Sequence, residues 1–199
     1  ADFSGDNVLK INDISKSFET KSLFDSLSLT MRNGDRIALI GDNGSGKTTL
    51  LNIISKNSYP DTGSIVYNPS GKSAMLPQII SFADENRSIL DTMLYDLNVS
   101  TQTARNRLAS FLFFGDEVFD SVKTLSGGER SRLKLCEIMA GDINLLILDE
   151  PTNHLDITSR EWIEEAVEEY SGALLFVSHD RFFINKFANR IWELRDGEI

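Results

Sequence analysis

The stretch Gly41-Asp42-Asn43-Gly44-Ser45-Gly46-Lys47-Thr48-Thr49 decides the fold of this chain. It fits the pattern G-x-x-x-x-G-K-[ST] of a phosphate-binding loop. Residues 36–40, a short apolar run before it, predict a buried strand, and residues 50–54 after it predict a helix. Because strand, loop and helix come in the order that the motif requires, the stretch predicts a nucleotide site rather than a glycine-rich turn without a ligand.

The residue types in this loop match the chemistry of a polyphosphate. Glycines let the backbone wrap the phosphates with its N–H groups pointing inward, and the start of the helix adds a partial positive charge. Lys47 supplies a full charge to the outer phosphates, and the Thr48 hydroxyl can ligate Mg²⁺. We therefore expect the phosphates to be held by Gly41, Asp42, Asn43, Gly44, Ser45, Gly46, Lys47, Thr48 and Thr49.

The composition is that of a globular domain. A chain of 199 residues can bury one full core, with room for a subdomain. No apolar run is long enough to span a bilayer, so we expect no membrane insertion. The polar start gives no sign of a signal peptide, and the single cysteine, Cys136, excludes an internal disulfide, so we expect a cytoplasmic location. Cys136 stands among apolar residues of a predicted helix, which indicates a packing role.

The formal net charge of -10 disfavours direct binding to nucleic acid, which normally needs a basic patch. If the biological partner is RNA or DNA, parts of the protein outside this sequence should make most of the contact. A local basic strip could contribute, and Arg130 and Arg132 are candidates for it. A solvated helix face is the simpler interpretation of these two arginines.

Hydrophobic patterns along the chain predict alternating strands and helices. Residues 27–31 alternate apolar and polar side chains, as in an antiparallel strand with one wet face, whereas residues 145–148 are all apolar, as in a central parallel strand. Further strands are predicted at residues 8–14, 64–67, 74–76, 174–177 and 190–194.

Residues 78–145 are predicted to be mainly helical. Thr101 is expected to cap a helix with Ala104, Leu108, Phe111 and Leu112 on one face. Another helix is expected to begin after Ser126-Gly127-Gly128. A third is expected over residues 156–170, with Thr158 and Glu161 as a capping box.

These elements predict an α/β fold with a mostly parallel sheet and a helical insertion. In such folds, ligands bind at the carboxyl ends of the strands. The phosphate-binding loop lies at such an end, and so does the pair Asp149-Glu150, which follows the predicted strand 145–148. We therefore expect the two segments to meet.

Asp149 and Glu150 can divide the work of phosphoryl transfer. Neighbouring residues on an extended segment point in different directions, so one carboxylate can face Mg²⁺ and the other the attacking water. We assign Asp149 to the metal and Glu150 to the role of general base or water-positioning group. Two acids that simply end a strand are the alternative.

Two histidines, His154 and His179, both follow predicted buried strands. A zinc site made with Asp156 and Asp180 is possible by ligand type, but no histidine pair has helical spacing. The alternative for His179 is a hydrogen bond to the γ-phosphate that also holds Glu150 and water. For His154 we expect a core histidine satisfied by the backbone.

Six motifs in order resemble the nucleotide-binding domain of an ATP-binding cassette (ABC) protein. They are the phosphate-binding loop, Gln78, Leu125-Ser126-Gly127-Gly128-Glu129, Asp149-Glu150, Leu155-Asp156 and His179, and the resemblance covers nearly the whole chain. It implies the ABC ATPase fold, in which a P-loop NTPase core carries an antiparallel β subdomain and a helical subdomain, here about 79–144. It also implies Mg²⁺-dependent hydrolysis of ATP.

The resemblance gives roles to further residues. It implies that Phe18 stacks on adenine, where many members have Tyr, and that Gln78 reaches Mg²⁺ and the attacking water. It implies that Ser126, Gly127 and Gly128 contact the γ-phosphate held by a second cassette, and that Asp156 lines the interface. The catalytic set is then Lys47, Gln78, Glu150 and His179, and the metal set is Thr48, Gln78 and Asp149. Two cassettes are expected to close head-to-tail on two ATP molecules.

The motif Pro151-Thr152-Asn153-His154-Leu155-Asp156, followed by Ser178-His179-Asp180-Arg181-Phe182-Phe183, is similar to the F subfamily (ABC-F). Members of this subfamily have two cassettes in one polypeptide and act on the ribosome in translation or antibiotic resistance. The stretch 115–119 is similar to their second cassette, which lacks the long helical arm of the first. The resemblance therefore implies that residues 1–199 are one domain, the C-terminal cassette of a longer protein. Its partners would be an N-terminal cassette, or a second copy, and the ribosome. An ATPase subunit of a membrane transporter is the alternative.

Overall fold

The computed structural model of the protein describes residues 6–19 and 21–199. Most of the polar start considered above lies in residues 1–5, outside the described residues. The strands are β1 (Asn7–Phe18), β2 (Lys21–Arg32), β3 (Arg36–Ile40), β4 (Thr62–Tyr67), β5 (Ser73–Leu76), β6 (Leu145–Asp149), β7 (Ala173–Val177) and β8 (Arg190–Glu193). The helices are α1 (Lys47–Ile54), α2 (Ile89–Leu97), α3 (Thr101–Ser110), α4 (Gly127–Ile138), α5 (Ile157–Glu169) and α6 (Arg181–Phe187), with two 3-10 helices, η1 (Gly115–Phe119) and η2 (Val122–Thr124).

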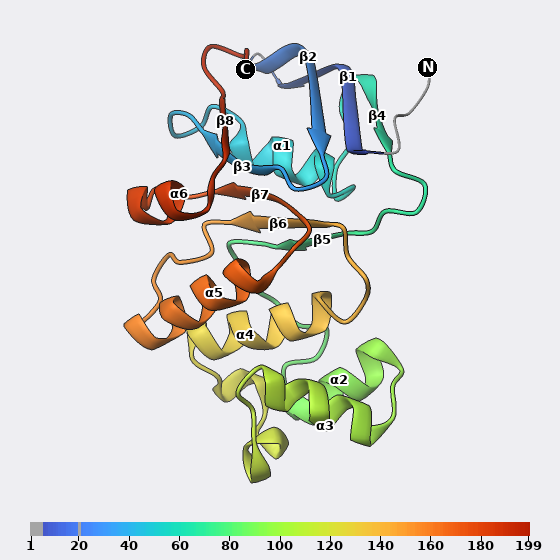
Figure 1. The fold of residues 1–199 in the computed structure, drawn as a ribbon, viewed down its shortest axis with the longest axis vertical. Helices are drawn as coiled ribbons and strands as arrows, with labels where there is room; N and C mark the ends of the chain where they lie inside the picture. The colour runs from blue at the N-terminus through green and yellow to red at the C-terminus, as the bar shows by residue number, and fades with distance from the viewer. Residues whose placement is uncertain (1–5, 20) are drawn as a thin grey trace.

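The strands form two sheets (Figure 1). One has the order β5-β6-β7-β3-β8, and all its neighbouring strands run parallel. The other has the order β2-β1-β4 and is antiparallel. The predicted α/β class, with a parallel sheet and a separate antiparallel part, is confirmed.

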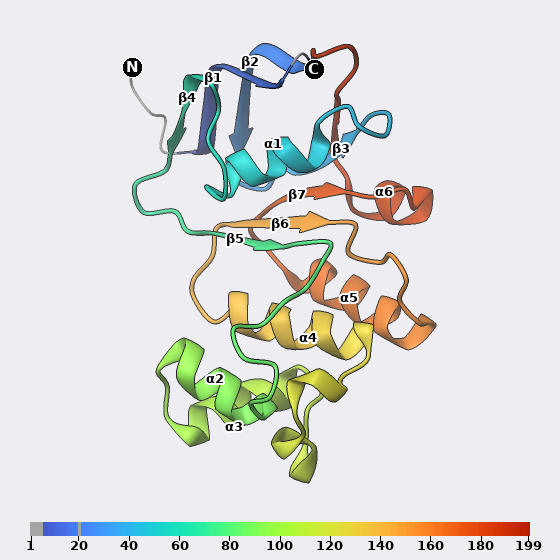
Figure 2. The same ribbon diagram turned by 180° about the vertical axis from the view of Figure 1, so that it is seen from behind.

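Helix α1 lies between the two sheets (Figure 2). Its buried side chains, among them Leu50, Leu51 and Ile54, join one core cluster with residues of both sheets, such as Ile11 from β1 and Ile147 from β6. Because α1 starts at the phosphate-binding loop, this cluster fixes the loop against the end of the parallel sheet.

Helices α4, α5 and α6 cover the other face of the parallel sheet (Figure 1). Helix α4 is buried on two sides, since Leu135 packs on the sheet while Leu133 and Cys136 pack with α2 and α3. Cys136 is fully buried, and burial raises the pKa of its thiol to about 12. The predicted packing role of Cys136 is thus confirmed. Helix α4 packs between the sheet and the outer helices.

Two predicted helix caps are wrong by one or two residues. Ser100, not Thr101, caps α3 and accepts a hydrogen bond from the backbone N–H of Thr103. Asp156, not Thr158, caps α5 and accepts from the backbone N–H of Ser159. In both cases the residue that caps the helix lies just upstream of the predicted one. Its side chain accepts a hydrogen bond from a free backbone N–H group of the first turn.

The predicted apolar face of α3 is also too long. Ala104 and Leu108 are fully buried, but the helix ends at Ser110. Leu112 follows with a φ of +62° and a side chain that is 41% exposed. The chain turns here, and Phe113 packs back into the helical core, whereas Phe114 is 55% exposed.

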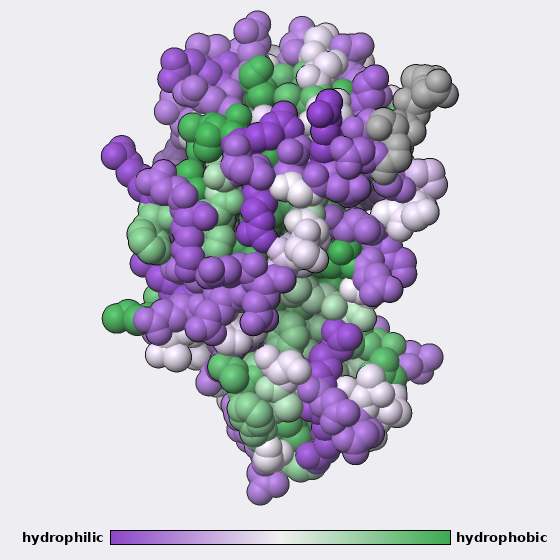
Figure 3. All heavy atoms as spheres, viewed as in Figure 1, coloured by the Kyte–Doolittle hydropathy of each residue, from purple (hydrophilic) through white to green (hydrophobic). Residues whose placement is uncertain are grey.

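The surface is hydrophilic over most of the face in Figure 3, with apolar side chains between the polar ones. Among the described residues, every helix is too short or too polar to cross a membrane.

Candidate functional site

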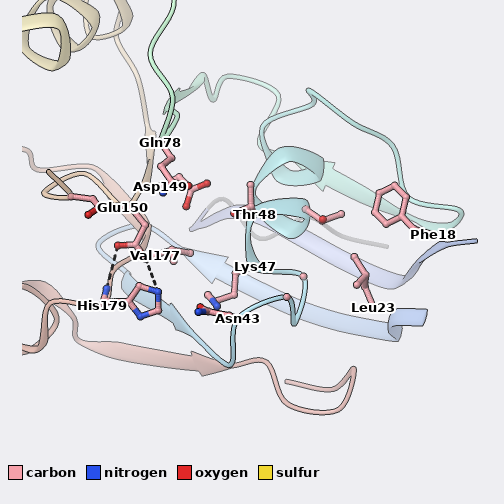
Figure 4. A pocket seen from close by; sticks show the side chains of 14 residues that line it. Phe18, Leu23, Asn43, Lys47, Thr48, Gln78, Asp149, Glu150, Val177 and His179 are labelled. Carbon is pink, nitrogen blue, oxygen red and sulfur yellow. Dashed lines mark hydrogen bonds and ion pairs between the residues drawn. The ribbon is translucent and has the colours of Figure 1, made fainter. Parts of the chain in front are cut away.

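A cavity of about 550 Å³ opens where α1 begins and where β6 and β7 end (Figure 4). It brings together segments that lie far apart in the sequence. Of the predicted site residues, its wall contains Phe18, Asn43, Gly44, Gly46, Lys47, Thr48, Thr49, Gln78, Asp149, Glu150 and His179.

The phosphate-binding loop forms the floor of this cavity. Gly46, which precedes α1, has a φ of +107°, a conformation that is cheap only for glycine. A Cβ atom there would also lie 3.2 Å from Leu23. Gly41 is equally restricted, because a Cβ atom would lie 2.4 Å from the carbonyl oxygen of Leu194.

Lys47 is nearly buried at the first position of α1. Its ammonium group donates hydrogen bonds to the carbonyl oxygens of Gly41 and Asp42, at 2.8 and 2.9 Å. Both acceptors are neutral groups of the loop itself. The positive charge is therefore held over the cavity without an anionic partner among the hydrogen bonds of the described residues.

Asp149, the last residue of β6, is 2% exposed, and its Oδ1 atom is buried without a hydrogen-bond partner among the described residues. Burial raises the pKa of the Asp149 carboxyl, although a hydrogen bond from Thr48 and the charge of Lys47 oppose the rise. Figure 4 places Asp149 beside Thr48 and Gln78.

Glu150 turns away from the strand with a φ of +51°. Its backbone N–H donates to the carbonyl of Val177, at 2.9 Å, which ties it to the end of β7. Its carboxylate accepts the backbone N–H of His179 at 3.3 Å and lies 3.2 Å from His179 Nε2 (Figure 4). Asp149 and Glu150 thus face different groups, as the sequence predicts.

Phe18 and Gln78 lie on the rim. Phe18 is 54% exposed at the end of β1, and the ammonium of Lys16 lies 5.4 Å from its ring centroid. Gln78 is exposed and follows β5 by two residues. Both side chains are therefore free to meet a ligand that enters the cavity.

These residues fit a magnesium nucleotide by their chemistry. An unpartnered carboxylate oxygen and a hydroxyl, from Asp149 and Thr48, are the oxygen donors that Mg²⁺ takes. The Ser45 hydroxyl is a second buried group without a partner among the described residues, and it belongs to the loop itself. Buried polar atoms of this kind are uncommon unless a ligand or an ion satisfies them.

Gly41, Asp42 and Ser45 belong to the phosphate-binding loop without lining the cavity, and the other predicted site residues lie apart from it. Ser126 and Asp156 line a second, smaller cavity of about 220 Å³ between the starts of α4 and α5. Ser126 caps α4: its hydroxyl accepts from the backbone N–H of Glu129 at 3.3 Å, and its own N–H donates to the Glu129 carboxylate at 2.7 Å. Gly127 is exposed beside it.

Gly128 is buried where α4 meets α5. A Cβ atom at this position would lie 1.8 Å from the hydroxyl of Ser159. That hydroxyl donates to the Asp156 carboxylate at 2.7 Å, and together with the Ser159 backbone N–H it lowers the pKa of Asp156. The glycine therefore lets two helix starts approach closely.

The expectation for His154 is wrong. His154 is exposed with a φ of +59°, in a turn where a core position is impossible. No group of three or more metal-ligating side chains gathers in residues 6–19 and 21–199, so the zinc alternative finds no support there.

Arg130 is not part of a solvated basic strip. Its guanidinium is part-buried and pairs with the Glu85 carboxylate. This contact joins residues 45 positions apart, and the sequence pattern gave no signal for it.

Sequence reasoning also missed Leu23, Asn153, Val177 and Ser159, all of which contact a site. Leu23, Asn153 and Val177 line the large cavity. Ser159 could have been found from its spacing, since Asp156-x-x-Ser159 is a helix-cap pattern.

Comparison with known proteins identifies relatives of the chain. Residues 24–153 match the family described as ABC transporter. Bacillus subtilis YdiF is 40% identical over 198 residues, covering 98% of this chain and 31% of its own length. ABC transporter F family member 5 of Arabidopsis thaliana is 38% identical, covering 98% and 28%.

The B. subtilis ribosome protection protein VmlR is 36% identical over 186 residues, which cover 94% of this chain and 34% of its own length. The chain thus spans about one third of the length of these relatives. Among solved structures, the dimeric ATP-binding cassette MJ0796, in a post-hydrolysis state with ADP and Pi, superposes with a TM-score of 0.81. It is 22% identical and covers 96% of both chains, a likeness that shows the fold.

Proposed function

The chain belongs to the ABC transporter family of ATP-binding cassettes, and on this premise we propose that it is the ATPase cassette of an ABC-F protein acting on the ribosome. The observation that carries the ATPase part of the proposal is the cavity that collects Lys47, Thr48, Asp149, Glu150 and His179, and the ribosomal part is supported by the relatives. As a member of this family, the chain is an ATP-binding domain of the ATPase class.

ATP binds with its phosphates on the loop 41–49. Lys47 exchanges its carbonyl partners for phosphate oxygens, a gain because a charged acceptor makes the stronger hydrogen bond. Phe18 offers an exposed ring to the adenine. Thr48, Asp149 and Gln78 would hold Mg²⁺, which neutralises phosphate charge when bound.

Hydrolysis needs a group that orients a water molecule and takes its proton. Glu150 has this role: its carboxylate lies at the cavity wall, and the His179 backbone N–H and ring hold it in place. The water oxygen bonds to the γ-phosphorus as the bond to the β–γ bridging oxygen breaks, giving ADP and phosphate. His179 is 68% exposed at its side chain and can contact the γ-phosphate as well as Glu150.

The second half of the reaction site comes from another cassette. Ser126, Gly127, Gly128 and Asp156 lie outside the ATP cavity of their own chain, on the starts of α4 and α5. A helix start with an adjoining serine is suited to an anion brought by a partner. The dimeric arrangement named for MJ0796 supports a head-to-tail pair, formed with an N-terminal cassette or with a second copy.

The proposed role on the ribosome is supported by the relatives, of which one is named a ribosome protection protein. The net charge of -10 indicates that other parts of the protein make most contacts with rRNA. Because we propose a role on the ribosome, we place the protein in the cytoplasm. We also propose that the chain is the C-terminal cassette of a two-cassette polypeptide.

Sedimentation of the full-length protein with ribosomes tests this role. A variant with Glu150→Gln should pellet with ribosomes in ATP and stay in the supernatant in ADP. The same variant with Lys47→Ala, which should bind no ATP, is the control. Recovery with membranes in both nucleotides would instead favour a transporter subunit.

A further inference from the structure

The loop that carries Gln78 has no regular secondary structure of its own. It runs from Pro77, after β5, to Ser88, before α2. The end of this loop is held by backbone hydrogen bonds: the N–H of Val122 donates to the carbonyl oxygen of Arg87, and the N–H of Lys123 donates to that of Glu85. Nearer to Gln78, the Arg130 side chain on α4 holds the loop.

The guanidinium of Arg130 makes a fork of contacts with this loop. Its Nη2 donates to the carbonyl oxygen of Ile80 at 3.1 Å. Nη2 and Nη1 also donate to the two carboxylate oxygens of Glu85, at 2.5 and 3.3 Å. Arginine suits this geometry because its planar fork matches a carboxylate, which lysine cannot reproduce.

The pair is shielded on its arginine side, while the Glu85 side chain is 42% exposed. The Arg130 side chain is 18% exposed, and its guanidinium lies 5.3 Å from the ring centroid of Phe82. The ammonium of Lys134, one turn along α4, lies 5.1 Å from the same ring. The side-chain hydrogen bond from Arg130 lowers the pKa of the Glu85 carboxyl, which favours its charged form.

The same residue is bonded to the start of α4. The backbone N–H of Arg130 donates to the carbonyl oxygen of Ser126 at 2.9 Å. Arg130 therefore belongs to the helical turn that presents Ser126, Gly127 and Gly128. One side chain connects the loop at this chain's own nucleotide with the surface that is proposed to meet a partner's nucleotide.

We propose that Arg130, with Glu85, is a positioning residue for ATP hydrolysis: it holds the Gln78 loop to α4 so that Gln78 enters the cavity when the start of α4 is correctly placed. The inference rests on the proposed function. It assigns Arg130 no contact with ATP, since Arg130 does not line the cavity. It acts through Ile80, two residues from Gln78.

The first test is Arg130→Ala in the full chain. At saturating ATP and fixed protein concentration, kcat should fall about tenfold, the equivalent of about 1.4 kcal/mol. The dissociation constant for a fluorescent ATP analogue should stay within about twofold, because Lys47 and the loop remain. Hydrogen exchange of the amides in 79–87 should accelerate.

Arg87→Ala is the matched control. Arg87 is an arginine of the same loop whose ion pairs, with Asp84 and Asp96, involve residues of that loop and α2 and not α4. This variant should keep the wild-type kcat. Arg130→Lys should recover part of the lost activity, because it keeps the charge without the fork.

A double-variant cycle with Gln78→Ala separates positioning from general damage. If Arg130 acts through Gln78, Arg130→Ala should lower kcat little further in the Gln78→Ala background. Equal losses in both backgrounds, or wild-type kcat and exchange in Arg130→Ala, would overturn the inference. Failure of the wild-type protein to hydrolyse ATP would instead overturn the proposed function, and the exchange data would still decide whether Arg130 holds the loop.

Discussion

The ATP cavity and the start of α4 are both expected to contact phosphate, yet the single chain leaves them in different states. In the cavity, Asp149 Oδ1 and Ser45 Oγ are buried without partners among the described residues. At the start of α4, Ser126 and Glu129 satisfy each other, and Asp156 is bonded to Ser159. Beside the α4 start, Arg132 Nε is also buried without a partner among the described residues, but the serine and carboxylate groups there are satisfied. The ATP cavity therefore leaves groups of the phosphate-binding loop and of the proposed metal site unsatisfied, whereas the α4 start leaves an arginine nitrogen unsatisfied.

This difference indicates an order of events. A region with unsatisfied buried groups gains by binding a ligand, so ATP should enter the cavity first. The Ser126 and Asp156 side chains at the α4 start already have hydrogen-bond partners and have less to gain, so this region should join only when a second cassette presents the bound nucleotide. The four predictions that follow break one region while leaving the other intact.

The largest expected effect is on the chemical step within the cavity. Glu150→Gln should lower the rate of phosphate release about 10²–10⁴-fold, the usual contribution of a general base. ATP affinity should be unchanged, and a closed pair of cassettes should accumulate in ATP. Glu165→Gln, an exposed acid on α5, is the control. Wild-type phosphate release in the Glu150 variant would remove Glu150 from its role.

Loss of the loop cation should weaken the cavity before chemistry begins. Lys47→Ala should reduce ATP affinity by about 30-fold or more, or roughly 2–5 kcal/mol, the cost of truncating one member of a buried charge pair. Isothermal titration with ATP and Mg²⁺ measures this change. Lys72→Ala, an exposed lysine next to β5, should bind ATP normally. Retained affinity in the Lys47 variant would contradict the phosphate assignment.

The α4 start can be tested without any nucleotide. Gly128→Ala should lower the free energy of unfolding by about 1–3 kcal/mol, because the added methyl overlaps Ser159. Gly127→Ala is the matched control: nothing lies within 4 Å of its added Cβ. It should be neutral or more stable, by up to about 1 kcal/mol. Urea unfolding compares the two, and equal stabilities would show that the predicted close approach is absent.

The smallest expected effect concerns the cost of burying the Asp149 carboxylate. Burial raises the pKa of Asp149, so the folded protein binds this proton more tightly than the unfolded chain. The carboxylate therefore contributes stability below its unfolded pKa, about 4, and loses it as pH rises through the higher folded pKa. Asp149→Asn should accordingly raise the stability of the nucleotide-free protein at pH 8 by about 1 kcal/mol, or roughly 2–4 °C in Tm.

Thermal unfolding in EDTA over a pH series measures this difference. The advantage of the Asp149 variant should shrink toward pH 4, where the wild-type carboxyl is protonated. The same variant should lose stabilisation by Mg²⁺ and ATP. A variant that is less stable than the wild type at pH 8 and equal at pH 4 would contradict the assigned burial cost.

Local patterns predicted the parallel sheet and the cavity well. The phosphate-binding loop follows β3, Asp149 ends β6 with Glu150 next to it, and His179 lies two residues after β7. Parallel strands bring these carboxyl ends together. Residue types then implied the chemistry. Because the carboxyl ends of the parallel strands meet, eleven of the predicted residues lie together in the cavity wall.

Contacts between distant segments could not be predicted in the same way. The bonds between Arg130 and Glu85 depend on how an irregular loop packs on α4, and the clash at Gly128 depends on the approach of α5. Neither leaves a periodic trace in the sequence. The prediction of the α3 cap was wrong for a local reason. The adjacent residues Ser100 and Thr101 both suit a cap, and only the path of the chain decides between them.

The central claim is that the ATP cavity of one cassette and the α4 start of another form one hydrolytic site. The most direct measurement is the specific ATPase rate of this chain as a function of its own concentration, with the association state followed by sedimentation. If the two surfaces form one site, the rate per molecule should rise steeply with concentration and level off when ATP-bound pairs dominate. A constant rate per molecule, with the protein monomeric throughout, would contradict it.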